Sequence, residues 1–171
     1  VLIPFLFARS ARFLAGSTPR ISFGVGKAVA LKRKSVSDKV YVLLSDGELN
    51  EGSNWEATMF AAHHQLDNLV AIIDYNNLQS LTTVEQTLKL EPIGKKFEAF
   101  GWDVKQVNGH NLEELTNAFS SIPWYKDKPS VLICETIKGH GVSFMHNKVE
   151  WHYRPPNKEQ LKAALEELKN A

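Results

Sequence analysis

Short apolar segments alternate with amphipathic ones along most of the chain, and this order constrains the fold more than any other feature. The segments that read as buried strands are 39–44, 68–76, 102–108 and 130–137. The segments with apolar residues at helical spacing are 21–34, 53–66, 92–100, 111–122 and 157–171. Strands that alternate with helices over short loops form a parallel sheet covered on both faces. We therefore expect an α/β fold with a doubly wound, mostly parallel sheet.

Local patterns indicate where several helices begin. Ser53 has Glu56 three residues later, the spacing of a capping box, so we expect Ser53 to cap its helix. Pro92 is expected to begin the next helix, and Asn111 to cap the one after it. In the closing helix one apolar stripe is expected, made of Leu161, Ala164, Leu165 and Leu168.

The composition excludes several classes of protein. With 171 residues, 43% of them hydrophobic and 23% charged, the chain can bury a real core. The formal net charge of +1 provides no strong field for nucleic acid, and no apolar run reaches the length of a membrane span. The single cysteine, Cys134, excludes an internal disulfide framework and favours a reducing, cytoplasmic location.

The first residues differ in charge from the rest of the chain. No Asp or Glu precedes Asp38, whereas basic residues are frequent there. Three interpretations stay open for this segment: an organelle transit segment, an ordinary buried strand or a truncated start. We divide the chain into a divergent N-terminal segment, 1–20, and a single domain, 21–171.

Polar residues follow two neighbouring strands of the expected sheet. Asp46-Gly47 comes directly after the first strand, and Asn76-Asn77 ends the second. In parallel sheets ligands bind beyond the carboxyl ends of the strands, where both pairs and the KGHGVSF turn would lie. Carboxylate, amide and carbonyl oxygens suit Mg²⁺ or Ca²⁺, and a glycine N–H can approach a phosphate closely. Each pair taken alone could equally be an ordinary turn.

The segment DGELNEGSNWEATMFAAHHQLDNLVAIIDYNNLQ resembles the thiamine diphosphate signature, which usually starts Gly-Asp-Gly and ends Asn-Asn. It is most similar to the transketolase family, in the N-terminal diphosphate-binding domain. FEAFGWDVKQVNGHN, KPSVLICETIKGHGVSF and VEWHYRPPN continue the match in order, from about Ile21 to the C-terminus. The resemblance implies a thiamine diphosphate-binding fold and a chain like the N-terminal subunit of split transketolases, truncated at its start.

The same resemblance implies a cofactor site for thiamine diphosphate. Asp46, Asn76 and the carbonyl of Leu78 would bind Mg²⁺ or Ca²⁺. The N–H of Gly47 would contact the cofactor diphosphate, and Ser45 stands in the first position of the signature, which is usually glycine.

Two further residues match functional positions of the family. Glu51 matches a glutamate that lies near the dimer interface and helps couple two active sites. His152 matches a histidine that reaches the diphosphate and the substrate side of the pocket, and it is the catalytic candidate. His140 lies in the loop that lines the cofactor end of the domain in this family.

The resemblance implies an enzyme of the pentose phosphate pathway, which transfers a two-carbon ketol unit between sugar phosphates. The pyrimidine-binding domain of the family has no match in this sequence. A C-terminal domain or subunit is therefore the expected partner, in a homodimer or a heterotetramer. Neither nucleic acid nor a membrane is expected as a partner.

The sequence also departs from the family pattern. Ser45 replaces glycine, and AGSTPR, with Pro19 and Arg20, replaces a glycine-rich segment and would stiffen and crowd the backbone. The upstream family segment that carries further histidines has no match. These departures leave two alternatives: a non-catalytic relative that acts through its interface, and an enzyme like deoxyxylulose-phosphate synthase. A plain nucleotide-binding module is disfavoured because SDGELN lacks a glycine-rich turn.

Overall fold

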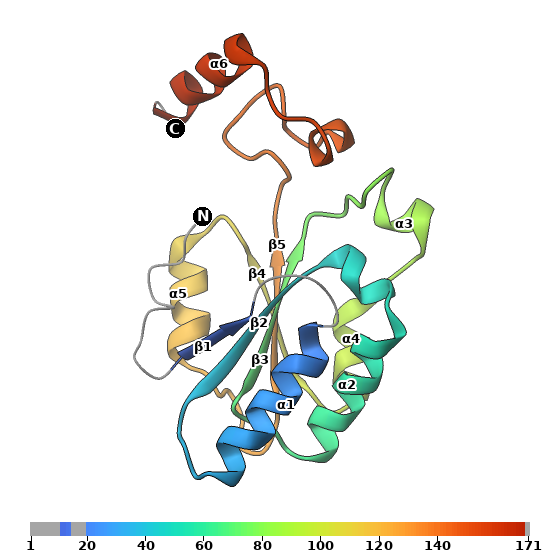
Figure 1. Cartoon of the computed structure of the whole chain (residues 1–171), viewed down its shortest axis with the longest axis vertical. Coiled ribbons are helices and arrows are strands. Elements are labelled where there is room, and N and C mark those ends of the chain that lie inside the picture. The colour runs from blue at the N-terminus through green and yellow to red at the C-terminus, as the bar shows by residue number, and fades with distance from the viewer. Residues whose placement is uncertain (1–10, 15–19, 170–171) are drawn as a thin grey trace.

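The computed structural model describes residues 11–14 and 20–169, and it confirms the doubly wound α/β fold (Figure 1). All strand pairs of its five-stranded sheet are parallel, and the strand order is β1-β2-β3-β5-β4. The strands are β1 (Ala11–Leu14), β2 (Lys39–Ser45), β3 (Leu69–Tyr75), β4 (Asp103–Asn108) and β5 (Ser130–Glu135). β1 lies within the segment that we had separated as divergent, for which a buried strand was one of three open interpretations.

Helices cover both faces of the sheet. The α-helices are α1 (Arg20–Arg33), α2 (Gly52–His63), α3 (Val84–Thr87), α4 (Ile93–Ala99), α5 (Leu112–Ser120) and α6 (Lys158–Lys169). Two short 3-10 helices, η2 (Asp46–Asn50) and η3 (Val149–His152), were not predicted. α1, α2 and α4 lie on one face of the sheet and α5 on the other (Figure 1).

The predicted helix starts are confirmed in part. The side chain of Asn111 accepts hydrogen bonds from the first turn of α5, and Pro92 is the N-cap residue of α4. Ser53 is not a cap, so that prediction was wrong: α2 already begins at Gly52, after Glu51. The capping box lies one element earlier, between Ser45 and Glu48, because the chain enters η2 directly from β2.

The core has two parts, one on each face of the sheet. The larger part packs α1, α2 and α4 against the strands and centres on aromatic residues such as Phe97 and Trp102. The smaller part lies under α5 and includes Leu115 and Ile72. β3 contributes to both parts, because alternate residues of a strand point to opposite faces.

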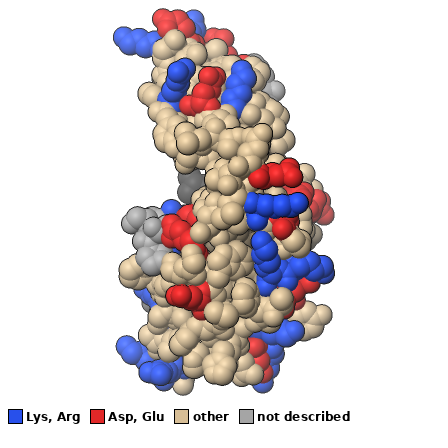
Figure 2. Space-filling view, turned by 90° about the vertical axis from the view of Figure 1, so that its right-hand side faces the viewer, with Lys and Arg blue, Asp and Glu red and all other residues tan. Residues whose placement is uncertain are grey.

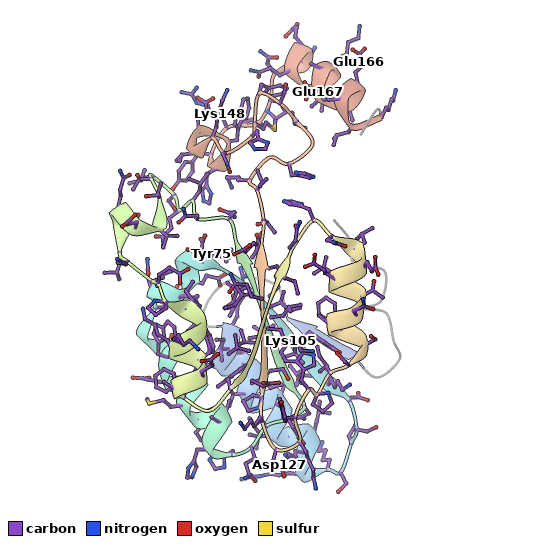
Figure 3. All side chains as sticks on the ribbon, turned by 180° about the vertical axis from the view of Figure 1, so that it is seen from behind. Tyr75, Lys105, Asp127, Lys148, Glu166 and Glu167 are labelled. Atoms are coloured by element: carbon purple, nitrogen blue, oxygen red, sulfur yellow. The ribbon has the colours of Figure 1, made fainter. Side chains whose placement is uncertain are left out.

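Residues 136–169, which we call the arm, continue from β5 beyond the carboxyl ends of the strands and carry η3 and α6 (Figure 1). Figure 3 shows Tyr75 at the end of the sheet near the arm and Asp127 at the opposite end. The rest of the described chain, which we call the body, contains the sheet. On the face seen in Figure 2, charged side chains of both signs are scattered over the arm and the body between uncharged residues.

α6 packs on the arm itself. Ala164 is buried, whereas Leu161, Leu165 and Leu168 are each about half exposed. The predicted apolar stripe therefore exists on the helix, but most of it faces away from the core. Within the described ranges, no helix combines the length and the apolar content that a membrane crossing needs.

Candidate diphosphate and metal site

Asp46 lies where β2 ends, next to the end of β3. Ser45, the last residue of β2, pairs with Asp74 of β3, so Asp46 and Asn76 follow neighbouring strand ends. Asp46 is only 2% exposed, and the backbone N–H groups of Gly47, Asn77 and Asn76 lie near its carboxylate. The structure thus brings together the aspartate and the asparagine that the sequence analysis selected.

The carboxylate of Asp46 is held in an environment that favours an added positive charge. Burial raises its pKa to about 6, and the nearby Asp74 contributes to the rise, although the backbone hydrogen bonds oppose it. Its Oδ2 atom is buried without a hydrogen-bond partner among the described residues. A buried, unpaired carboxylate oxygen fits a metal ligand, because a cation would supply the missing interaction.

The turn after β3 can supply two further oxygen ligands. Leu78 N–H donates to Asn76 Oδ1 at 3.1 Å, and Asn77 between them has a positive φ of 61°. Leu78 bridges to Thr83, and the flanking backbone hydrogen bonds run from Val84 N–H to Asn77 and from Gln79 N–H to Thr82. The carbonyl of Leu78 lies outside both of these bonds.

The described residues contain no group of three or more His, Cys, Asp or Glu side chains that could hold a metal ion. A metal here would therefore depend on amide and carbonyl oxygens besides Asp46. That donor set of Asp46, Asn76 and Leu78 suits Mg²⁺ or Ca²⁺. The assignment of these three ligands stays a prediction.

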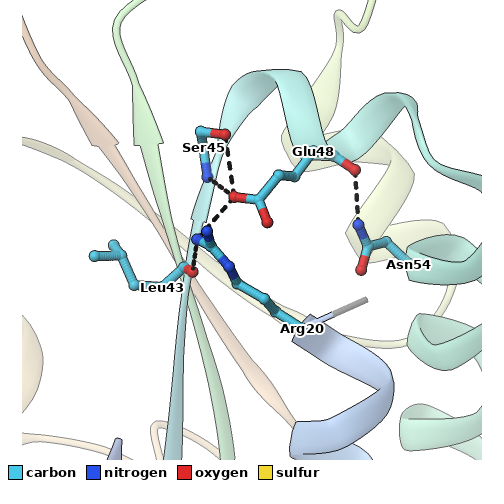
Figure 4. Close-up of polar contacts among 5 residues, drawn as sticks. All are labelled: Arg20, Leu43, Ser45, Glu48 and Asn54. Atoms are coloured by element: carbon cyan, nitrogen blue, oxygen red, sulfur yellow. Dashed lines mark hydrogen bonds and ion pairs between the residues drawn. The ribbon is translucent and has the colours of Figure 1, made fainter. Parts of the chain in front are cut away.

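Ser45 has a defined role in place of the usual glycine (Figure 4). Its backbone is extended, with φ of −88° and ψ of 162°, so this position does not need glycine. The backbone N–H and Oγ of Ser45 donate to Glu48 Oε2 at 2.8 and 3.1 Å. Arg20 pairs with the same Glu48 oxygen at 2.9 Å and also donates to the carbonyl of Leu43 at 2.9 Å.

Arg20 was expected to crowd the backbone beside this site. It instead begins α1 and connects that helix to the end of β2 through the two contacts drawn in Figure 4. The other residues of AGSTPR, including Pro19, lie outside the described residues. The arginine that departs from the family pattern thus stabilises the turn that carries Asp46.

Gly47 lies within η2, and Glu51 follows its last residue. The open side of Gly47 faces the side chain of Gln79, whose Cδ would lie 3.7 Å from an added Cβ. Glu51 occupies the N-cap position of α2, and its backbone N–H donates to the carbonyl of Glu48 at 3.1 Å. The diphosphate contact of Gly47 and the interface role of Glu51 remain predictions.

His152 lies on the arm, at the end of η3, and its side chain is exposed. Its Nδ1 atom is 3.4 Å from Nζ of Lys138. Lys138 in turn lines a cavity of about 360 Å³ together with Asn76 and Asp74. Within the described part of the chain, no hydrogen bond or ion pair joins His152 directly to Asp46 or Asn76. Lys138 is a cationic neighbour of the site that the sequence analysis did not select.

His110, a histidine that the sequence analysis did not select, lines the same cavity. His110 Nε2 accepts a hydrogen bond from the N–H of Ile137 at 2.8 Å. Its ring stacks on that of His140, with centroids 3.8 Å apart. Burial and the neighbouring His140 lower the pKa of His110, although Asp74 opposes this shift. The neutral form of His110 is therefore favoured, and this form can accept the hydrogen bond from Ile137 at the start of the arm.

Comparisons with known proteins agree with this geometry. A family model described as the transketolase thiamine diphosphate binding domain matches residues 28–169. An apulose-4-phosphate transketolase subunit of Phocaeicola vulgatus is 45% identical over 148 residues, which cover 86% of this chain and 53% of that protein. A 6-deoxy-6-sulfo-D-fructose transketolase subunit of Clostridium sp. is 39% identical over 147 residues, covering 86% and 54%.

A solved structure is similar as well. The crystal structure of a transketolase from Campylobacter jejuni superposes with a TM-score of 0.81 at 31% sequence identity. The match covers 87% of this chain and 24% of the other. The chain spans about half the length of the two transketolase subunits that it matches.

Proposed function

The chain belongs to the transketolase family, through its thiamine diphosphate binding domain, and on that premise we propose a specific part in the reaction. It is the portion that holds Mg²⁺ and the diphosphate of thiamine diphosphate. The complete enzyme transfers a two-carbon ketol unit between sugar phosphates, in reactions such as those of the pentose phosphate pathway.

One observation carries this proposal. Asp46 is almost fully buried at the carboxyl end of β2, and its Oδ2 atom has no partner within the described residues. Buried carboxylates are normally paired, and the neighbouring groups here are other oxygens and backbone N–H donors rather than a cation. A metal ion would satisfy the oxygens, and a diphosphate bound to that ion would accept hydrogen bonds from the N–H donors.

Each candidate residue then has a limited role. Asp46, Asn76 and the Leu78 carbonyl hold Mg²⁺, and the N–H of Gly47 contacts the diphosphate. Lys138 adds positive charge beside His152, which faces the substrate side. Thiamine diphosphate, when bound, supplies the nucleophilic carbon and the electron sink of the reaction.

The proposal includes a partner. Two relatives are named as subunits, and the chain covers about half of each of them. We therefore propose that a pyrimidine-binding domain or subunit completes the active site, in a dimer or heterotetramer. Neither the non-catalytic alternative nor the one like deoxyxylulose-phosphate synthase is favoured over a transketolase by any of the matches reported above.

The sugars that appear in the names of the relatives are not assigned to this chain as substrates. One is named for apulose-4-phosphate and another for 6-deoxy-6-sulfo-D-fructose, although both are similar to this chain. A cytoplasmic location is also proposed, since the free, buried Cys134 suits a reducing compartment.

Calorimetric titration of thiamine diphosphate tests the proposal. Binding should be measured with Mg²⁺ and with EDTA, for the unaltered chain and for Asp46→Ala, with and without an added pyrimidine-binding subunit. We expect binding that depends on Mg²⁺ and disappears in the variant. A folded chain that shows no Mg²⁺-dependent binding even with the partner present would contradict the proposed function.

A further inference from the structure

A buried amide donor without an acceptor lies against Gly47, the residue that follows Asp46 in the chain. The side chain of Gln79 is only 9% exposed, and its Nε2 atom has no hydrogen-bond partner among the described residues. Asp46 Oδ2, a buried acceptor, is equally without a partner there. Since buried polar atoms are nearly always hydrogen-bonded, these two unpaired atoms, one in η2 and one in the loop that packs against it, require an explanation.

Contacts with the η2 turn fix the position of Gln79. Its Cγ and Cδ atoms would lie 3.8 and 3.7 Å from a Cβ atom added to Gly47, so the side chain lies against this glycine. Asn50 Nδ2 donates a hydrogen bond to Gln79 Oε1 at 3.0 Å. Because this bond occupies the oxygen of the amide, the free end of the amide is the NH₂ donor.

The two unpaired atoms require partners of opposite charge. A buried N–H donor is satisfied by an oxyanion, whereas a buried carboxylate oxygen is satisfied by a cation. A phosphate group that is itself bound to a metal ion supplies both partners at once.

We infer that Gln79 is a binding residue for the diphosphate, to which its Nε2 atom donates a hydrogen bond. Asn50 is a positioning residue that holds the amide of Gln79 in the required orientation. This inference rests on the proposed function and assigns Gln79 to the anion rather than to the metal.

The opposite orientation of the amide makes a different prediction. Asn50 Oδ1 is also buried without a partner among the described residues. If both amides were turned over, Asn50 Oδ1 would accept from Gln79, and Gln79 would present an oxygen to the site. Gln79 would then strengthen binding of the cation and weaken binding of the diphosphate.

Two substitutions separate these orientations. Gln79→Met keeps a side chain of similar length but removes the donor, and Gln79→Glu replaces the donor with a negative charge. The matched control is Gln86→Ala, because Gln86 is exposed on the same connection, in α3. Thiamine diphosphate and inorganic pyrophosphate should each be titrated into the full chain with Mg²⁺, and Mn²⁺ binding should be measured alone by electron paramagnetic resonance.

We expect Gln79→Met to weaken binding of both diphosphates about tenfold to a hundredfold, the effect of losing a hydrogen bond to a charged group. Gln79→Glu should weaken it further, Gln86→Ala should leave it unchanged, and Mn²⁺ binding should be the same in Gln79→Met as in the unaltered chain. Fluorescence of Trp55, whose Nε1 donates to the Leu49 carbonyl at 2.7 Å, checks that the turn stays folded.

Three results would overturn the inference. Unchanged diphosphate affinity in Gln79→Met contradicts the role of Gln79 alone and leaves the proposed function standing. Weaker Mn²⁺ binding in Gln79→Met than in the unaltered chain indicates the reversed amide, in which Gln79 presents its oxygen to the cation. If the unaltered chain binds neither diphosphate, even with a pyrimidine-binding subunit, the proposed function fails and the inference fails with it.

Discussion

The body and the arm hold their functional residues by different means. In the body, β3 and β5 are buried over most of their length, and the pairing of β2 with β3 places Asp46 beside the end of β3. Within the described arm, Val142 and Ala164 are the buried apolar residues, and hydrogen bonds in loops position His152. The comparison indicates that the position of Asp46, a proposed metal ligand, is set by the fold, whereas that of His152 depends on weaker, local contacts.

The largest effect on stability should come from the core of the body. Phe97 is fully buried and contacts the rings of Trp55 and Trp102. Phe97→Ala should lower the free energy of unfolding by about 3–5 kcal/mol, because it removes buried apolar surface and leaves a cavity. Urea denaturation followed by tryptophan fluorescence measures the change.

The matched change in the arm is Leu165→Ala. Leu165 is about half exposed on α6, so the same experiment should show a change within about 0.5 kcal/mol. A loss as large as that of Phe97→Ala would show that the arm has a core of its own or that a partner covers α6, and the contrast between the two regions would fail.

A backbone change should affect the arm more than its exposed side chains do. Gly139 has a positive φ of 74°, and an added Cβ would lie 2.5 Å from the carbonyl oxygen of Met145. Gly139→Ala should destabilise the arm by at least about 1–2 kcal/mol, because both the conformation and the space oppose a side chain. Hydrogen exchange should accelerate across the arm, while amides of β3 keep their protection.

Gly26→Ala is the control for this substitution. Gly26 lies in α1, where an added Cβ would meet nothing within 4 Å. This variant should be more stable by about 0.5–1 kcal/mol, since alanine favours a helix. If Gly139→Ala also left exchange in the arm unchanged, the local contacts described here would not determine its structure.

A smaller effect on amide exchange is expected where α6 is hydrogen-bonded to the loop after Gly141. The carboxylate of Glu167 accepts hydrogen bonds from the N–H and from the hydroxyl of Ser143, the second at 2.7 Å. Ser143→Ala removes the hydroxyl donor but keeps the backbone bond. Amides of α6 should exchange a few times faster, and a variant with unchanged exchange would show that this bond is unimportant.

The smallest expected effect is a dependence on pH. The two hydrogen bonds from Ser143 lower the pKa of Glu167 below its ordinary value of 4.5. Because the folded pKa is below the unfolded one, this contact stabilises the arm fully above about pH 4.5 and is lost as the pH falls through the folded value. Protection factors of the α6 amides, which correct for the intrinsic pH dependence of exchange, should fall in that range, and Glu167→Gln should remove this fall.

The fold could be predicted because its main elements have strong periodic patterns. The strands and most helices begin and end within about three residues of their expected positions, and the parallel sheet follows from their alternation. For the segment that contains β1 a strand stayed one of three interpretations, because four residues among basic neighbours have no clear period. α2 was expected to start at Ser53, because the sequence does not reveal that η2 intervenes and shifts the capping box to Ser45.

The site could be predicted only where it depends on strand ends. Asp46 and Asn76 each follow an apolar run, so their proximity follows from a parallel pair of strands. The contact of Lys138 with His152 joins residues on a loop, and no periodic pattern reveals it. Gln79 was missed because a glutamine after a turn is ordinary in sequence, and only its burial and its unpaired Nε2 distinguish it.

The most direct test of this account compares Asp46→Asn with His152→Ala in one calorimetric titration of thiamine diphosphate with Mg²⁺, in the presence of a pyrimidine-binding subunit. If the body holds the diphosphate, Asp46→Asn should abolish measurable binding, while His152→Ala should weaken it no more than about tenfold. Equal loss of binding in both variants, or retained binding in Asp46→Asn, would contradict the claim that the strand ends of the body anchor the cofactor.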